Sequence, residues 1–163
     1  MKLFIGLWLI VFSLWLGAGV VFARVTPEDI VNLQKQAYQV KVKNYSSSHQ
    51  QKLDNLVGKI ALVNKTRTDE LNQIMKIQAA ILDECQQRST EKNQEEVEKA
   101  RYWITFAHEA VAYQQAKIYI FGLSSEANIK NDVLEAVNLF WGELNSTRGK
   151  VIYSQNILEE LVK

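Results

Sequence analysis

Apolar side chains recur along this chain at two kinds of spacing. A largely apolar run occupies residues 3–22, with Lys2 before it and no acidic residue within it. After residue 24, apolar positions instead recur every three or four residues, which places them on one face of an α-helix. We find no alternating strand pattern bounded by turns. The pattern therefore predicts an all-α protein behind an apolar N-terminal segment.

The first two helices are separated by a serine-rich stretch. Thr26-Pro27-Glu28-Asp29 is typical of a helix start, because it combines a capping residue, a first-turn proline and two acids. The apolar seam of this first helix is Ile30, Leu33, Ala37 and Val40. Ser47 and Gln50 could form a capping box for a second helix over about residues 49–87, or the stretch could be helical throughout. The second seam is Leu53, Leu56, Ile60, Val63, then Leu71, Ile74, Ile77, Ile81 and Cys85, with Arg67 inside it.

The third helix has the most regular pattern. Starting after Ser89-Thr90, it carries a strict 3-4 seam of Val97, Ala100, Ile104, Ala107, Val111, Gln114, Ile118 and Phe121. An adjoining seam consists of Trp103, Phe106, Ala110, Tyr113 and Ile120, so we expect this helix to contact more than one neighbour. Gly122 is expected to end the helix as a C-terminal cap.

The last helix is expected over about residues 126–162, capped by Ser124 or Ser125. Its seam is Ile129, Val133, Val137, Phe140, Leu144, Val151, Leu158 and Leu161. Short connectors near 88–90 and 122–125 make neighbouring helices antiparallel. The predicted fold is an antiparallel bundle of three long helices with coiled-coil-like packing over residues 49–163. A shorter juxtamembrane helix and linker over residues 24–48 precede it, behind the signal or anchor helix of residues 1–23.

The N-terminal run fits either a signal peptide or a membrane anchor. Val21 and Ala23 provide small or aliphatic side chains before a cut at Arg24, which favours cleavage. The run is, however, about 20 residues long, which suffices to span a membrane. Both interpretations place the remainder outside the cytoplasm, either secreted, periplasmic or membrane-anchored and facing outward.

Composition excludes several classes of function. The chain has 19 basic and 18 acidic residues, and without Lys2 the two numbers are equal. Such a neutral surface argues against a nucleic-acid binder. Cys85 is the only cysteine, so the domain has no internal disulfide. It is expected to be a buried small hydrophobe near a helix end, with a cross-link between two chains as the alternative.

No motif indicates catalysis or a cofactor. The two histidines, His49 and His108, lack a Glu-x-x-His partner pattern, so we expect no metal site. The chain has neither a Gly-x-Ser-x-Gly elbow nor a phosphate loop. We therefore expect a protein that is not an enzyme and has no catalytic residues and no cofactor.

Five residues form a candidate partner or ligand surface: Arg67, Tyr102, Trp103, Tyr113 and Tyr119. Arg67 could select a partner, or its stem could lie along the seam while the guanidinium reaches water or Glu70, which we favour. The aromatic residues could line a pocket or fill the core, and core packing is favoured. Three Asn-x-Ser/Thr triplets, at Asn44, Asn64 and Asn145, are all expected to be exposed.

The apolar seams are regular and no polar site converges between them, which favours a protein-contact or structural role over a ligand-binding role. The leading hypothesis is an exported, non-enzymatic bundle that acts by protein–protein contact or self-association, or as a structural element of the cell envelope. Membrane contact would be made through residues 3–22 if they are not cleaved. The alternative is an extracytoplasmic sensory or carrier bundle that encloses a small ligand in an aromatic-lined pocket.

Overall fold

The described part of the chain is entirely helical in its regular structure. The computed structural model describes residues 27–90 and 93–162, with the backbone alone for residues 27–30. Its elements are α2 (Pro27–Val42), α3 (Ser47–Gln87), α4 (Gln94–Ala116), a 3-10 turn η2 (Glu126–Asn128) and α5 (Ile129–Val162). Residues 31–163 form one compact unit, to which the following description applies.

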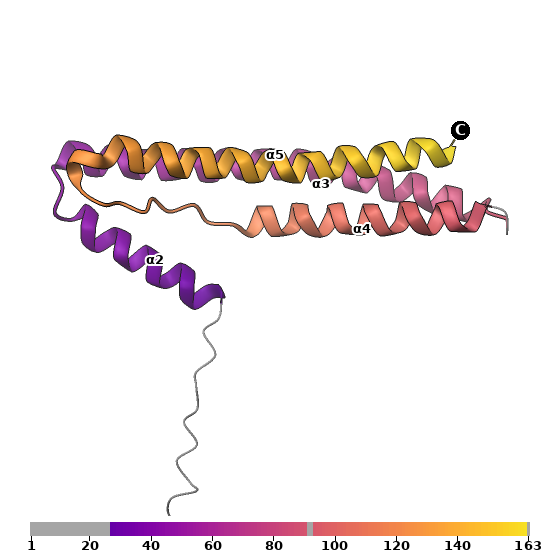
Figure 1. Cartoon of the computed structure of the whole chain (residues 1–163), viewed down its shortest axis with the longest axis horizontal. Coiled ribbons are helices and arrows are strands. Elements are labelled where there is room, and N and C mark those ends of the chain that lie inside the picture. Colours follow the sequence, from indigo (N-terminus) through magenta and orange to yellow (C-terminus); the bar gives the residue numbers. More distant parts are fainter. Residues whose placement is uncertain (1–26, 91–92, 163) are drawn as a thin grey trace, which may run out of the picture. The chain divides into compact units, whose positions relative to one another are not determined.

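The three long helices pack in the predicted up-down-up order. In Figure 1, α3 and α5 run in the same direction and α4 runs in the opposite one. Helix α4 packs against both α3 and α5, as its two adjoining seams predict. Its main seam is confirmed from Val97 to Gln114, because every residue of that seam in α4 is buried. The all-helical bundle is thus confirmed for the described residues.

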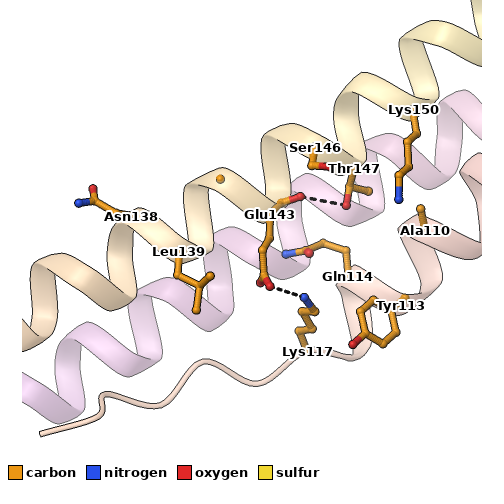
Figure 2. A pocket seen from close by; sticks show the side chains of 11 residues that line it. Ala110, Tyr113, Gln114, Lys117, Asn138, Leu139, Glu143, Ser146, Thr147 and Lys150 are labelled. Carbon is orange, nitrogen blue, oxygen red and sulfur yellow. Dashed lines mark hydrogen bonds and ion pairs between the residues drawn. The ribbon is translucent and has the colours of Figure 1, made fainter.

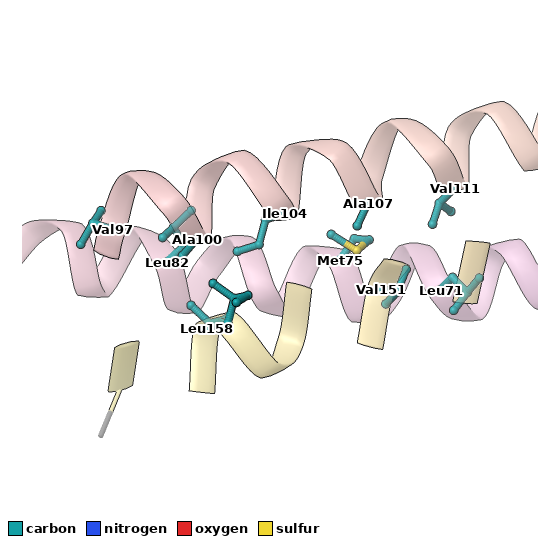
Figure 3. Close-up of a cluster of buried hydrophobic side chains, with 11 residues drawn as sticks. Leu71, Met75, Leu82, Val97, Ala100, Ile104, Ala107, Val111, Val151 and Leu158 are labelled. Carbon is teal, nitrogen blue, oxygen red and sulfur yellow. The ribbon is translucent and has the colours of Figure 1, made fainter. Parts of the chain in front are cut away.

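The core consists of two clusters along the bundle. The first, shown in Figure 3, joins the C-terminal half of α3 to α4 and to the end of α5. The second joins the start of α3 and the middle of α5 to Val42, Phe121 and Leu123. The gaps in the predicted α5 seam are filled by the buried small polar residues Thr147 and Ser154.

The predicted seam of α3 is wrong in its second half. Leu71 is buried, but Ile74, Ile77 and Ile81 are exposed. The buried stripe instead follows Leu71, Met75, Gln78 and Leu82, and continues backwards through Thr68 and Asn64. Polar residues occupy the inner face because they find hydrogen-bond partners on the other helices, and this sets the rotation of α3.

The predicted seam of α2 is also wrong where the structure describes it. Leu33, Ala37 and Val40 are exposed, and the side chain of Ile30 lies outside the described residues. Helix α2 packs through its other face instead. Val42 is buried, and Tyr38 contacts the Phe121 ring and donates a hydrogen bond to Asp54 at 3.2 Å.

Helix α4 ends at Ala116, five residues before the predicted end at Phe121. Residues 117–125 are an irregular connection, and Lys117 has an extended backbone. The unequal lengths of α3 and α4 explain why the connection is extended and not helical. Helix α3 is about 60 Å long and α4 about 35 Å, and nine residues of extended chain cover about 30 Å, more than twice what they would cover as a helix. The β-branched and aromatic residues 118–121 also favour a helix weakly.

The predicted helix caps at Gly122, at Ser47 and at Ser124 or Ser125 are wrong. Gly122 does not adopt the left-handed conformation, since no described glycine has a positive φ. Ser125 precedes η2 without a side-chain capping bond, and Ser46, rather than Ser47, precedes α3, also without one. Ser124 instead donates from its backbone N–H to Asp132 at 2.7 Å.

The proposed signal or anchor segment, residues 1–23, lies outside the described residues. Among the residues that the structure describes, no helix is both long enough and apolar enough to cross a bilayer.

The connection yields a test of the fold. Phe121 is 2% exposed, whereas Ile118, its partner in the predicted helical seam, is 49% exposed. We expect Phe121→Ala to lower the free energy of unfolding by about 3–5 kcal/mol, the cost of a large cavity. Ile118→Ala should cost less than about 1 kcal/mol. Urea unfolding of the full chain measures both, and equal losses would indicate that the connection is helical after all.

Candidate functional site

The five predicted surface residues do not form one site. Arg67 is exposed, and its Nη1 contacts Glu70 Oε2 at 2.8 Å, so the guanidinium reaches Glu70 as expected. Tyr102 is exposed, while Trp103 is half-buried and packs against the core. Tyr113 is exposed on α4, and Tyr119 lies half-buried in the connection.

The exposed aromatic residues of α4 form a cluster with α5. Trp103 makes an edge contact with Tyr153 at a centroid distance of 4.6 Å, and Tyr102 stacks parallel to Phe106 at 6.4 Å. Lys150 Nζ lies 4.8 Å from the centre of the Phe106 ring. These contacts join α4 to α5, so the aromatic side chains contribute to helix packing.

A chain of hydrogen bonds crosses the middle of the bundle. The Asn64 side chain donates to the backbone carbonyl of Gln114 at 2.9 Å, and Gln114 Nε2 donates to Asn64 Oδ1 at 3.0 Å. Gln114 Nε2 also donates to the Tyr119 hydroxyl at 2.7 Å. Asn64 and Gln114 are both buried, so each satisfies the polar atoms of the other.

This chain of hydrogen bonds continues to an ion pair on α5. The Tyr119 hydroxyl donates to Glu143 at 2.7 Å, and Lys117 Nζ contacts the other carboxylate oxygen of Glu143 at 2.6 Å. Burial and the Glu143 hydrogen bond raise the pKa of Tyr119. Burial alone would raise the pKa of Glu143, but the hydrogen bonds from Lys117 and Tyr119 outweigh it and lower that pKa. The residues thus hold the connection against α5.

A groove of about 450 Å³ lies beside this ion pair, between α4 and α5 (Figure 2). Tyr113 lines it together with Leu139, Gly142 and Lys150. Lys117, which also lines the groove, is neutralised by Glu143. Tyr113 is therefore the candidate aromatic residue on this groove, while Tyr102 and Trp103 pack with Phe106 and Tyr153.

A second groove runs between α3 and α5. Its central hollow, of about 470 Å³, has walls formed by Ile74, Ile77, Ile81 and Val162, with Leu158 and Gln78 among its other lining residues. An adjoining hollow of about 350 Å³ shares Ile74 and continues to Trp141. We call the two hollows together the α3–α5 groove.

The α3–α5 groove is charged differently at its two ends. Arg67 and Arg148 lie at one end, beside Glu70. Glu159 lies at the other end, and Glu84 is on the same exposed face of α3, one turn after Ile81. Arg67 is paired with Glu70, and Glu84 is paired with Arg88. Arg148 at one end and Glu159 at the other are therefore the groove charges that form no ion pair with a described residue, and they flank the apolar middle.

A buried amide also forms the floor of this groove. Gln78 Nε2 donates to the backbone carbonyl of Val151 at 3.1 Å, and the Ser154 hydroxyl donates to Gln78 Oε1 at 2.8 Å. Sequence reasoning missed Asn64, Thr68 and Gln78, because it counted only apolar residues. The signal was present: these residues continue the 3-4 spacing of Leu71, Met75 and Leu82.

A third polar cluster ties the α2–α3 turn to the start of η2. Glu126 Oε1 accepts hydrogen bonds from the Ser46 backbone N–H at 2.9 Å and the Ser46 hydroxyl at 2.7 Å. His49 Nδ1 lies 2.6 Å from the same oxygen. The hydrogen bonds from His49 and Ser46 lower the pKa of Glu126 to about 2.

The three predicted Asn-x-Ser/Thr triplets differ in exposure. Asn44 and Asn145 are exposed as expected, but Asn64 is 3% exposed, because its side chain is committed to Gln114. A glycan on Asn64 is therefore incompatible with this fold.

Cys85 is intermediate in burial and His108 is exposed. Within the described ranges, no three His, Cys, Asp or Glu side chains are grouped so that they could hold a metal ion.

Comparisons with known proteins do not assign the chain to a family. No protein-family model matches the chain, and no curated protein or solved structure shows significant similarity to it.

The Asn64–Gln114 pair can be tested by a double-mutant cycle. Gln114→Leu leaves Asn64 Oδ1 buried without a donor, although Asn64 Nδ2 keeps the backbone carbonyl of residue 114, and this should cost about 1–3 kcal/mol of unfolding free energy. Adding Asn64→Leu removes the orphaned amide, so the double variant should be more stable than the sum of the single losses predicts. Gln73→Leu, at an exposed position of α3, is the control and should have little effect. Additive losses would show that the two amides do not interact.

The Glu126 cluster predicts a pH dependence. A carboxyl with a lowered folded pKa stabilises the fold above its unfolded pKa of about 4.5, and that contribution disappears as the pH falls towards about 2. Wild-type stability should therefore fall more steeply over this interval than that of Glu126→Gln. Urea titrations at several pH values measure both slopes, with exposed Glu135→Gln as control. Identical slopes for the wild type and Glu126→Gln would contradict the contact.

Proposed function

We propose that this protein is a non-enzymatic helical bundle, exported from the cytoplasm, that binds an amphipathic helix of a protein partner in the α3–α5 groove. The observation that carries the proposal is the row of exposed isoleucines on α3. Ile77 is 61% exposed on a helix whose opposite face is well packed. Contiguous apolar side chains of this kind mark interaction surfaces.

The geometry of the groove suits a helix. Its apolar wall extends over Ile74, Ile77 and Ile81, which repeat at 3-4 spacing along about 10 Å of α3. A partner helix presents anchors at the same spacing, so two turns of it fit the length of the wall. Helix α4 covers the opposite side of α3 and α5, so a docked helix would complete a fourth position of the bundle.

The charges at the ends of the groove favour a partner helix that carries its basic residues at one end. A helix with basic residues beyond its apolar stripe is attracted to Glu159 and repelled by Arg148. Such charges contribute orientation and association rate more than affinity. The affinity must therefore come from the apolar wall, where removal of apolar surface from water stabilises the complex by about 25 cal/mol per Å².

Export is supported by the sequence alone. The apolar run over residues 3–22 is typical of a signal peptide or a membrane anchor, and either would carry the bundle out of the cytoplasm. The alternative, a ligand-binding sensory or carrier bundle, would use the groove between α4 and α5. Of the aromatic candidates, Tyr113 lines that groove, so an aromatic enclosure for a ligand has less support.

Site-specific photocross-linking in the producing cells tests the proposal. A benzophenone side chain at position 77 of the full chain should form a defined protein adduct, whose cross-linked peptide maps to one apolar helical stripe. The same group at position 62 is the matched control, because Leu62 is 65% exposed on α3 but does not line the groove. Ile77→Lys should not alter the thermal unfolding midpoint, yet it should prevent a benzophenone at position 81 from forming the adduct. Equal labelling at positions 77 and 62, or no protein adduct at either, would contradict the proposal.

A further inference from the structure

The chain itself contains an exposed helix with the properties that the α3–α5 groove requires. Leu33, Ala37 and Val40 form one stripe on α2, here called the α2 stripe. Leu33 is 61% exposed and Val40 is 64% exposed, so the stripe is unpartnered within the compact unit. Helix α2 attaches to its own bundle through Tyr38 and Val42, which lie on the other face. The stripe is thus free to contact another molecule.

The lengths of the two surfaces match. Leu33 and Val40 are seven residues apart on α2, and Ile74 and Ile81 are seven residues apart on α3, about 10 Å in each case. Each surface repeats at the spacing of one helical face. Neither is covered by another described element, so each leaves apolar surface in contact with water.

The charges of the two surfaces match as well. Residues 31–43 include Lys35, Lys41 and Lys43 and no acidic residue. Lys41 and Lys43 follow the α2 stripe directly, and Lys43 is exposed and forms no ion pair with any residue that the structure describes. Lys41 Nζ donates to the backbone carbonyl of Leu123 in its own bundle, so Lys43 carries the charge match. Docked parallel to α3, α2 brings Lys43 towards Glu159, whereas the antiparallel orientation would bring it towards Arg148.

We propose that the occupant of the α3–α5 groove is α2 of a second copy of this chain. This inference rests on the proposed function and names its partner. The Tyr38 hydroxyl reaches Asp54 in the second turn of α3, so the chain reverses direction between α2 and α3. Parallel docking of α2 on the α3 of a second copy therefore requires the two bundles to run antiparallel, and a two-fold axis then places each α2 in the groove of the other copy.

Cysteine cross-linking between two populations of the full chain tests this inference. One population keeps Cys85, which follows Ile81 by one turn on α3. The other carries Val40→Cys together with Cys85→Ser, so that each chain has a single cysteine. The two are differently tagged and co-expressed, and a short bismaleimide is added to the intact cells. We expect a linked product that contains both tags.

A matched control and a charge reversal show whether the cross-link depends on the groove and on its charges. Leu62→Cys with Cys85→Ser is as exposed as the test variant but lies away from the groove, and should give no such product. Lys43→Glu in the test population should reduce the linked fraction about tenfold, equivalent to about 1.4 kcal/mol. Glu159→Lys in the Cys85 population should restore it.

The outcomes separate this inference from the proposed function. Equal linkage for Val40→Cys and Leu62→Cys, or none for either, overturns the second copy as the occupant. If the benzophenone at position 77 meanwhile captures a helix of a different protein, the groove remains a docking site and only its occupant changes. If position 77 captures no protein, both proposals fail.

Discussion

The hydrogen bonds of Asn64 and Gln78 fix the rotation of α3 about its own axis, and this rotation determines which side chains of α3 face solvent. Two stripes on this helix compete for the interior, one ending in isoleucines and one that includes Asn64 and Gln78. The second is buried because Gln114 pairs with Asn64, and Ser154 with Val151 satisfies Gln78. Turning α3 to bury the isoleucines would expose Asn64 and Gln78 and remove their hydrogen bonds to the buried Gln114 and Ser154. The paired amides therefore place Ile74, Ile77 and Ile81 on the outside.

The unequal helix lengths have a second consequence. Because α4 is much shorter than α3, the chain returns to the start of α5 in an extended form, and this form carries Phe121 and Leu123 into the core. The same segment carries Tyr119 to Gln114 and Glu143. At its end, Glu126 joins the turn that connects α2 to α3. Helix α2 is thus held at the end of the bundle by one face, which leaves the α2 stripe free.

The sequence predicts the class of fold but not the surfaces that matter for binding. Helical periodicity identifies α4 and its buried seam, because every position of that seam is apolar until Gln114. It fails on α2 and on the second half of α3, where an apolar stripe is exposed and polar or aromatic residues face inward. Periodicity cannot distinguish an inner stripe from a docking stripe, since both have the same spacing. The partners of Asn64, Gln78 and Tyr38 are remote in sequence, so only the fold shows that these residues are satisfied.

These features lead to one account of the protein as a bundle with an unfilled position between α3 and α5. The most direct test compares thiol labelling of Ile77→Cys and Met75→Cys, each with Cys85→Ser, across a range of protein concentrations. The account predicts slow labelling of Met75→Cys at every concentration, because Met75 is 2% exposed. Ile77→Cys should react rapidly in dilute protein and more slowly as concentration, and with it groove occupancy, rises. Equal labelling rates at the two positions in dilute protein would contradict the account.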